Sequence, residues 1–128
     1  MATAVTHGIR ITARVRYEEA HSDPKVGRFL FSYRITIANR SDETVQLLRR
    51  HWTIHDSLSP VREVEGPGVV GETPVLKPGE EFSYSSACDL RSGFGCMEGE
   101  YQMLRPRDGM LFHVIIPTMQ LSFPLAAN

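Results

Sequence analysis

The sequence predicts an all-β protein, an antiparallel β-sandwich of seven or eight short strands. Apolar side chains recur at every second position in several segments, which is the period of a strand with one buried and one exposed face. Clusters of glycine, proline, asparagine and aspartate separate these segments at the spacing of sandwich turns. No segment combines helical periodicity with a capping signal, and Ser57–Arg62 is expected to hold one helical turn at most.

The first half of the chain is predicted to contain the longest alternating strands. In Ile9–Tyr17, apolar residues alternate with arginine and threonine, which indicates one wet face. The same alternation continues over Phe29–Ile37, and turn chemistry follows at Asn39–Asp42. A further strand is expected from Val45 to Ile54 and includes the single tryptophan, Trp52.

The second half is predicted to contain the remaining strands and most of the glycine-containing turns. Met110–Ile116 is a more continuous apolar run, which is typical of a central strand. The other expected strands are Val61–Gly66, Phe82–Cys88, Tyr101–Met103 and Met119–Phe123. The predicted core residues are Phe31, Tyr33, Ile35, Trp52, Phe82, Tyr84 and Phe112.

Size and composition exclude several protein classes. The 128 residues, with 41% hydrophobic and 23% charged residues, predict one globular domain over 1–128 with an ordered core from about 8 to 125. No apolar run approaches the roughly 20 residues that span a bilayer. The net charge of −1 argues against a nucleic-acid partner. Two cysteines, Cys88 and Cys96, without a secretory signal predict free thiols and a cytoplasmic location.

Charge is distributed unevenly along the chain. Residues 1–64 contain ten Lys/Arg and seven Asp/Glu, whereas residues 65–128 contain four and eight. The pattern favours solvated strand faces over a binding patch, and it leaves the patch open as an alternative. The arginines of the basic half include Arg10, Arg14, Arg16, Arg28, Arg34, Arg49 and Arg50.

Gly66, Gly68 and Gly71 form a G-x-G-x-x-G motif, which in dinucleotide-binding folds connects a strand to a helix. Proline at positions 74 and 78 is incompatible with that helix, because proline removes a helical hydrogen bond and clashes with the preceding turn. Glu65 and Glu72 flank the motif with negative charge. The favoured interpretation is a strand-connecting loop that contacts a partner, and an anion or nucleotide site is the alternative.

Other chemical patterns do not assemble into a reaction centre. His51 and His55 share a face in a strand but stand about 13 Å apart, too far to bind one metal ion together. Ser83, Ser85 and Ser86 lack the G-x-S-x-G elbow of a nucleophilic serine. No catalytic residue, metal site or cofactor is therefore predicted, and the chain is expected not to be an enzyme.

The glycine segment also belongs to a longer pattern by which the chain closely resembles the ApaG family, from about residue 8 to 125. The most specific stretch is Gly68-Val69-Val70-Gly71, followed by Pro74, Leu76 and Pro78-Gly79. Further matching residues are Phe31-Ser32-Tyr33, Val45-Gln46-Leu47-Leu48, Arg50, Trp52, Phe82, Tyr84, Gly95, Met97, Gly99, Tyr101, Met103, Phe112, Ile116 and Pro117.

The resemblance implies an immunoglobulin-like or fibronectin type III-like β-sandwich. It also implies a link to magnesium efflux and cobalt resistance, and a role as a protein-interaction module. Ser85-Ser86-Ala87 departs from the usual Thr-Ser-Gly of the family, so one glycine hinge is missing.

Two hypotheses of different class follow. The first is a non-enzymatic module that binds an unidentified protein partner, with homodimerisation left open, through a loop formed by Gly66, Gly68, Val69, Val70, Gly71 and Pro74. The second is a small-ligand module that binds phosphate, a nucleotide or a divalent cation near Gly66–Gly71.

Overall fold

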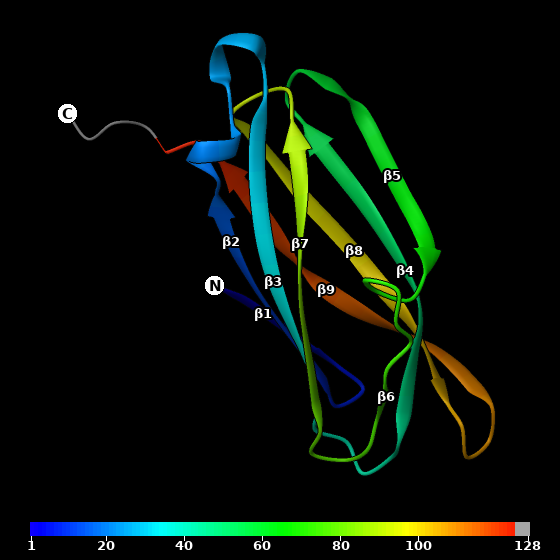
Figure 1. Cartoon of the computed structure of the whole chain (residues 1–128). Coiled ribbons are helices and arrows are strands. Elements are labelled where there is room, and N and C mark those ends of the chain that lie inside the picture. Colours follow the sequence, from blue (N-terminus) through cyan, green and yellow to red (C-terminus); the bar gives the residue numbers. More distant parts are fainter. Residues whose placement is uncertain (125–128) are drawn as a thin grey trace.

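The computed structural model describes residues 1–124 and contains nine strands in two antiparallel sheets (Figure 1). The first sheet has the order β1-β2-β3-β7, and all of its neighbouring strands are antiparallel. Its strands are β1 (Ala2–Thr6), β2 (Ile9–Tyr17), β3 (Phe29–Asn39) and β7 (Glu81–Leu90).

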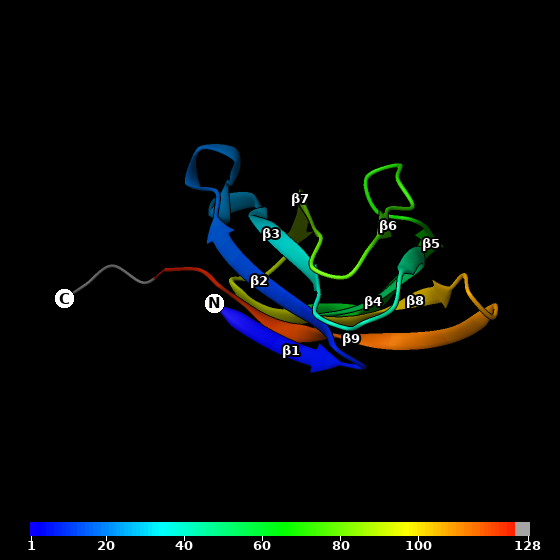
Figure 2. The same ribbon diagram turned by 90° about the horizontal axis from the view of Figure 1, so that it is seen from below.

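The second sheet has the order β5-β4-β8-β9, and the two-residue strand β6 also pairs with β4. The two sheets lie face to face (Figure 2), which confirms the predicted antiparallel β-sandwich, although residues 1–124 form nine strands rather than seven or eight. No helix among residues 1–124 is long and apolar enough to cross a membrane. The strands of this sheet are β4 (Val45–Asp56), β5 (Ser59–Pro67), β6 (Val75–Leu76), β8 (Phe94–Arg105) and β9 (Met110–Ser122).

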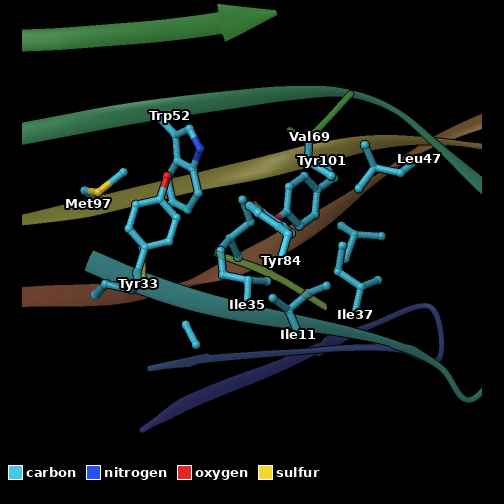
Figure 3. Packing of buried hydrophobic residues seen from close by; sticks show 14 of the residues in the cluster. Ile11, Tyr33, Ile35, Ile37, Leu47, Trp52, Val69, Tyr84, Met97 and Tyr101 are labelled. Atoms are coloured by element: carbon cyan, nitrogen blue, oxygen red, sulfur yellow. The ribbon is translucent and has the colours of Figure 1, made fainter. Parts of the chain in front are cut away.

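The core lies between the sheets because every second side chain of each long strand points inward. Figure 3 shows Tyr33 beside Trp52, and Tyr84 beside Tyr101, between strands of opposite sheets. Of the predicted core residues, five are buried and two are partly buried against the core. The buried five are Phe31, Tyr33, Ile35, Trp52 and Tyr84, and the partly buried two are Phe82 and Phe112.

A β-bulge in β4 changes which side chains face the core. Leu47 pairs with Met103 and Arg49 with Gln102, so the β4 strand holds one residue more than β8 at Leu48. Before the bulge Leu47 is buried, and after it Trp52 is buried. The inward positions therefore change from odd to even numbers along this one strand.

Several sequence expectations need correction. The ordered part was predicted to begin near residue 8, but Ala2–Thr6 forms β1, which pairs with β2 through a tight turn at His7-Gly8. The region Ser57–Arg62 contains a β-hairpin turn and strand rather than a helical turn. The only helical turns in residues 1–124 are short 3-10 turns at Glu19–His21 and Pro24–Val26.

The last predicted strands also merge. Met110–Ile116 and Met119–Phe123 were expected to be separate, but β9 runs continuously from Met110 to Ser122. Met110–Ile116 was also expected to be a central strand, but β9 lies at the end of its sheet, next to β8. The register against β8 shifts between Ile116 and Met119, and this bulge accommodates Pro117 within the strand. The predicted end of the ordered core at residue 125 lies outside the described residues.

Candidate functional site

The glycine segment links β5 to β6, and no helix follows it. Val69 and Glu72 exchange two backbone hydrogen bonds of 2.9 Å, which makes Val70 and Gly71 the central residues of a tight turn. Their φ angles of +44° and +81° are both left-handed, as the type I′ turn requires. The N–H of Gly68 donates to the carbonyl of Leu48, at the β4 bulge, over 2.8 Å.

At each glycine of the motif, the local structure explains why a residue with a side chain would fit poorly. Gly66 lies opposite Arg50 in the β4–β5 pair, and a Cβ there would stand 3.2 Å from Nη1 of Arg50. Gly68 has a φ of +61°, and a Cβ would clash with the backbone carbonyl of Glu72. Gly71 has open space around it, so only its φ of +81° favours glycine.

The geometry of the motif leaves few donors for an anion. The N–H groups of Gly68, Val69 and Glu72 all donate to carbonyls of the chain itself. A nest that binds phosphate needs several N–H groups that converge on the ligand. In this conformation the segment is therefore a turn whose N–H groups at Gly68, Val69 and Glu72 are already used in hydrogen bonds to the chain's own carbonyls.

Arg50 braces this turn from the neighbouring strand. Its Nη1 atom donates to the carbonyls of Pro67 and Gly68 over 2.9 and 3.0 Å. The bulge at Leu48 places Arg50 on the same side of β4 as the buried Trp52, and this allows the guanidinium group to reach the loop. The loop is thus fixed by side-chain as well as backbone contacts.

The two valines of the turn have opposite environments. Val69 is buried in the core next to Tyr101 (Figure 3), whereas Val70 is 55% exposed at the tip. A left-handed conformation costs a residue with a Cβ roughly 1–2 kcal/mol, and a β-branched residue is an outlier there. The loop is therefore anchored by one valine and holds the other outward in a strained conformation. Pro74, the last predicted loop residue, is partly buried and accepts a hydrogen bond from the N–H of Leu47.

A cleft of about 230 Å³ lies at the open edge of the sandwich, between β5 and β7, and Arg50 contributes to its lining. Arg62 spans the cleft and donates from Nη2 to the carbonyl of Asp89 over 2.6 Å. The cleft also contains Tyr33, Ser86 and Cys88. Because Arg50 and Arg62 both hold carbonyl groups of the chain, the two cations at this edge support the backbone.

The groups that most often act as nucleophiles are held protonated. Burial raises the pKa of the Cys88 thiol to about 11, and burial also raises the pKa of Cys96. Burial raises the pKa of Tyr84 and of Tyr101, whose hydroxyl groups share a hydrogen bond of 2.5 Å. A thiolate or phenolate is therefore disfavoured at neutral pH.

The histidines and serines singled out in the sequence are dispersed. His51 and His55 both lie on the outer face of β4, and each contacts a different glutamate, Glu63 at 3.4 Å and Glu98 at 3.1 Å. Within residues 1–124, no group of three or more His, Cys, Asp or Glu residues is arranged to hold a metal ion. Ser83 and Ser85 face outward on β7, where they bond to Thr36 and Arg34.

Sequence reasoning missed the partners of the loop. Arg50 was noted only as one of several basic residues, because nothing in a linear pattern shows that it reaches Pro67 and Gly68. The sequence did contain one signal of this contact, because the apolar alternation breaks between Leu47 and Trp52. Such a break indicates a bulge, after which the side chains that face the core change from odd to even positions.

Comparison with known proteins identifies relatives of this chain by sequence. The profile of the ApaG domain matches residues 19–105. The chain is 50% identical over 124 residues to the protein ApaG of Brucella anthropi, and 48% identical to that of Brucella canis. Both alignments cover 97% of this chain and 95% of the relative.

Solved structures agree with the sequence matches. The putative ApaA protein of Bordetella pertussis superimposes with a TM-score of 0.86 at 37% identity, covering 91% of this chain and 94% of that one. A protein from Archaeoglobus fulgidus has a TM-score of 0.53 at 9% identity, with 89% and 97% covered, which is similarity of fold alone.

Proposed function

The chain belongs to the ApaG domain family, and we propose that it is a non-enzymatic protein-interaction module that contacts its partner through the loop from Gly66 to Pro74. The observation that carries the proposal is Val70, an exposed β-branched residue held at a φ of +44°. Such strain persists only where the surroundings enforce it, and it is concentrated at functional sites such as active sites, ligand clamps and switch segments.

The supports of the loop explain why a partner would recognise it. The loop is held in one conformation before binding by three supports. These are the burial of Val69 in the core, the hydrogen bonds from the Arg50 guanidinium group, and the Val69–Glu72 backbone hydrogen bonds. A loop that is ordered in advance loses little conformational entropy when it binds, so a small apolar contact is worth more. In this proposal, the link to magnesium efflux and cobalt resistance acts through the bound protein.

The absence of catalysis is part of the same proposal. It is supported by the raised pKa values of Cys88 and Cys96, because a cysteine nucleophile reacts as the thiolate. Arg50, which contacts the loop, and Arg62, further along β5, are both engaged with backbone carbonyls.

The proposal is tested with Val70→Asn. Asparagine adopts the left-handed conformation more readily than valine, so the turn is retained while the apolar side chain is removed. The matched control is Val61→Asn, because Val61 is 56% exposed and Val70 is 55% exposed, and Val61 lies in strand β5, outside the loop.

The measurement is a quantitative comparison of the proteins retained by the full chain and by each variant. Proteins that bind the wild type and Val61→Asn, but not Val70→Asn, support the proposal, with Val70→Asn at least as thermally stable as the wild type. An unchanged set of partners with Val70→Asn contradicts it. Titration with ATP, GTP and NAD tests the small-ligand alternative, since saturable binding that Gly68→Ala abolishes in a folded protein would favour a nucleotide site.

A further inference from the structure

The outer face of the β1-β2-β3-β7 sheet carries a central group of hydrogen-bond donors. Outward positions are fixed by the alternation with buried residues such as Ala13 on β2 and Ile35 on β3. Near the edges and ends of the sheet the outward side chains are Thr3 and Val5 on β1, Leu30 on β3, and Glu81, Ala87 and Asp89 on β7. Between them lie Arg10, Thr12, Arg14 and Arg16 on β2, Ser32, Arg34 and Thr36 on β3, and Ser83 and Ser85 on β7. We call this central set the arginine face.

The register places two of these cations directly opposite one another. Arg14 on β2 pairs with Arg34 on β3, and Arg34 pairs with Ser85 on β7. Like charges that face each other across a sheet destabilise it. Arg34 donates to Ser85 over 3.2 Å, but neither Arg14 nor Arg34 lies within ion-pair distance of a carboxylate in residues 1–124.

The ends of the face show the same lack of compensation. Arg10 forms no ion pair in the described part of the chain, and its buried Nε atom lacks a hydrogen-bond partner there. Carboxylates lie only toward the ends of the face: Glu18 lies 3.8 Å from Arg16 and accepts a hydrogen bond from Ser32, and Glu81 and Asp89 lie near the two ends of β7. The centre of the face therefore has positive charge without an internal counterion.

The outer face of the second sheet is built differently. Its glutamates each contact a basic side chain: Arg49–Glu65 at 3.1 Å, His51–Glu63 at 3.4 Å, His55–Glu98 at 3.1 Å and His113–Glu100 at 3.3 Å. The same chain therefore places a basic side chain beside each of these glutamates on one face, whereas Arg14 and Arg34 at the centre of the other face have no carboxylate beside them. A general need for solubility does not explain this difference.

The chemistry of the arginine face indicates its ligand. A guanidinium fork matches a carboxylate in a bidentate manner, and neighbouring hydroxyl groups add further donors. None of its outward side chains is aromatic, so it lacks the stacking platforms that bind single-stranded nucleic acid. From Arg10 to Arg16 the face spans about 20 Å, the length of roughly six extended residues.

We propose that the arginine face binds an extended segment rich in aspartate and glutamate from another protein, with Arg14 and Arg34 as its central contacts. This goes beyond the proposed function, because it concerns a second surface on the other sheet. Val70→Asn tests the loop and leaves the arginine face intact, so the two proposals fail separately.

The test uses the full chain and a fluorescent peptide of alternating glutamate and serine, about six residues long to match the face. The double variant Arg14→Ser/Arg34→Ser removes the central contacts. The control variant Arg49→Ser/Arg107→Ser removes the same charge at exposed residues outside the face that pair with Glu65 and Glu43. Fluorescence anisotropy gives the affinity, and thermal unfolding shows whether each variant is folded.

We expect saturable binding that weakens at least about tenfold in Arg14→Ser/Arg34→Ser and less than about twofold in the control. Binding should also weaken as ionic strength rises from about 0.1 to 1 M, because the Debye length falls from about 10 to 3 Å. No binding of the peptide, an equal loss in both variants, or tighter binding of a single-stranded oligonucleotide than of the peptide would overturn the proposal.

Discussion

The guanidinium group of Arg50 occupies the space that a side chain at position 66 would need. A Cβ at Gly66 would lie 3.2 Å from Nη1 and 3.4 Å from Cζ of Arg50. Because Gly66 has no side chain, Arg50 passes over it and holds the carbonyls of Pro67 and Gly68. The first glycine of the motif therefore leaves the space in which Arg50 of β4 forms its hydrogen bonds to the end of β5 and the loop.

Arg50→Met should lower the free energy of unfolding by about 1–3 kcal/mol, because it removes charged donors from two loop carbonyls while it keeps the alkyl chain. The loop amides of Gly68 and Val69 should then exchange their hydrogens faster. Urea unfolding and native-state hydrogen exchange measure these effects. Arg49→Met, on the outer face of the same strand, is the control, and an equal effect of both variants would contradict the role assigned to Arg50.

The two left-handed glycines should differ in their tolerance of alanine. Gly71→Ala is expected to cost about 1–2 kcal/mol, the strain of one left-handed residue, since its Cβ would meet open space. Gly68→Ala should cost more, because its Cβ would also clash with the carbonyl of Glu72. Chemical denaturation of both variants tests the order, and a Gly71 variant that is less stable than the Gly68 variant would contradict it.

Trp52→Ala should destabilise the sandwich by about 3–5 kcal/mol, as expected for a large buried aromatic residue. Trp52 is 3% exposed and contacts the edge of Tyr33 at a ring-centroid distance of 5.7 Å. Circular dichroism is the appropriate probe, because the variant removes the single tryptophan. Trp52→Phe should retain more of the stability, and an Ala variant as stable as the wild type would show that Trp52 contributes little to the core.

The two thiols should react at different rates. Cys96 on β8 is partly exposed, whereas Cys88 on β7 is buried, and both are free thiols. A thiol reagent at neutral pH should modify Cys96 first and Cys88 only after unfolding. The denatured protein, prepared without reductant, should give a count of two thiols. A count of zero in a monomer would instead indicate a disulfide bond.

Alkaline pH should weaken the fold partly through Cys88. Burial raises the pKa of Cys88 from 9.0 to about 11, so between these values the unfolded chain loses a proton that the folded chain retains. The stabilisation is therefore complete below pH 9 and decreases as the pH rises toward 11. Stability curves of the wild type and Cys88→Ala should converge over this range, and parallel curves would contradict the shift.

The sequence by itself determined the strands and their inner faces. Alternation along a strand is a local property with a period of two, so Ile9–Tyr17 and Phe29–Ile37 were predicted with boundaries close to those of β2 and β3. The strand-connecting loop at Gly66–Gly71 was predicted from equally local information, because proline and glycine restrict or release φ within a few residues. β1 was missed because Ala2–Thr6 is short and only partly apolar, and it becomes a strand by pairing with β2.

Only the tertiary structure decided which distant residues meet. The bulge at Leu48 turns Arg50 toward the loop, and strand pairing sets Arg14 opposite Arg34, which lies twenty positions further along the chain. These relationships depend on register, and register is fixed by the packing of both sheets on a shared core rather than by any one segment. The candidate loop could therefore be located from the sequence, but its brace and the arginine face could not.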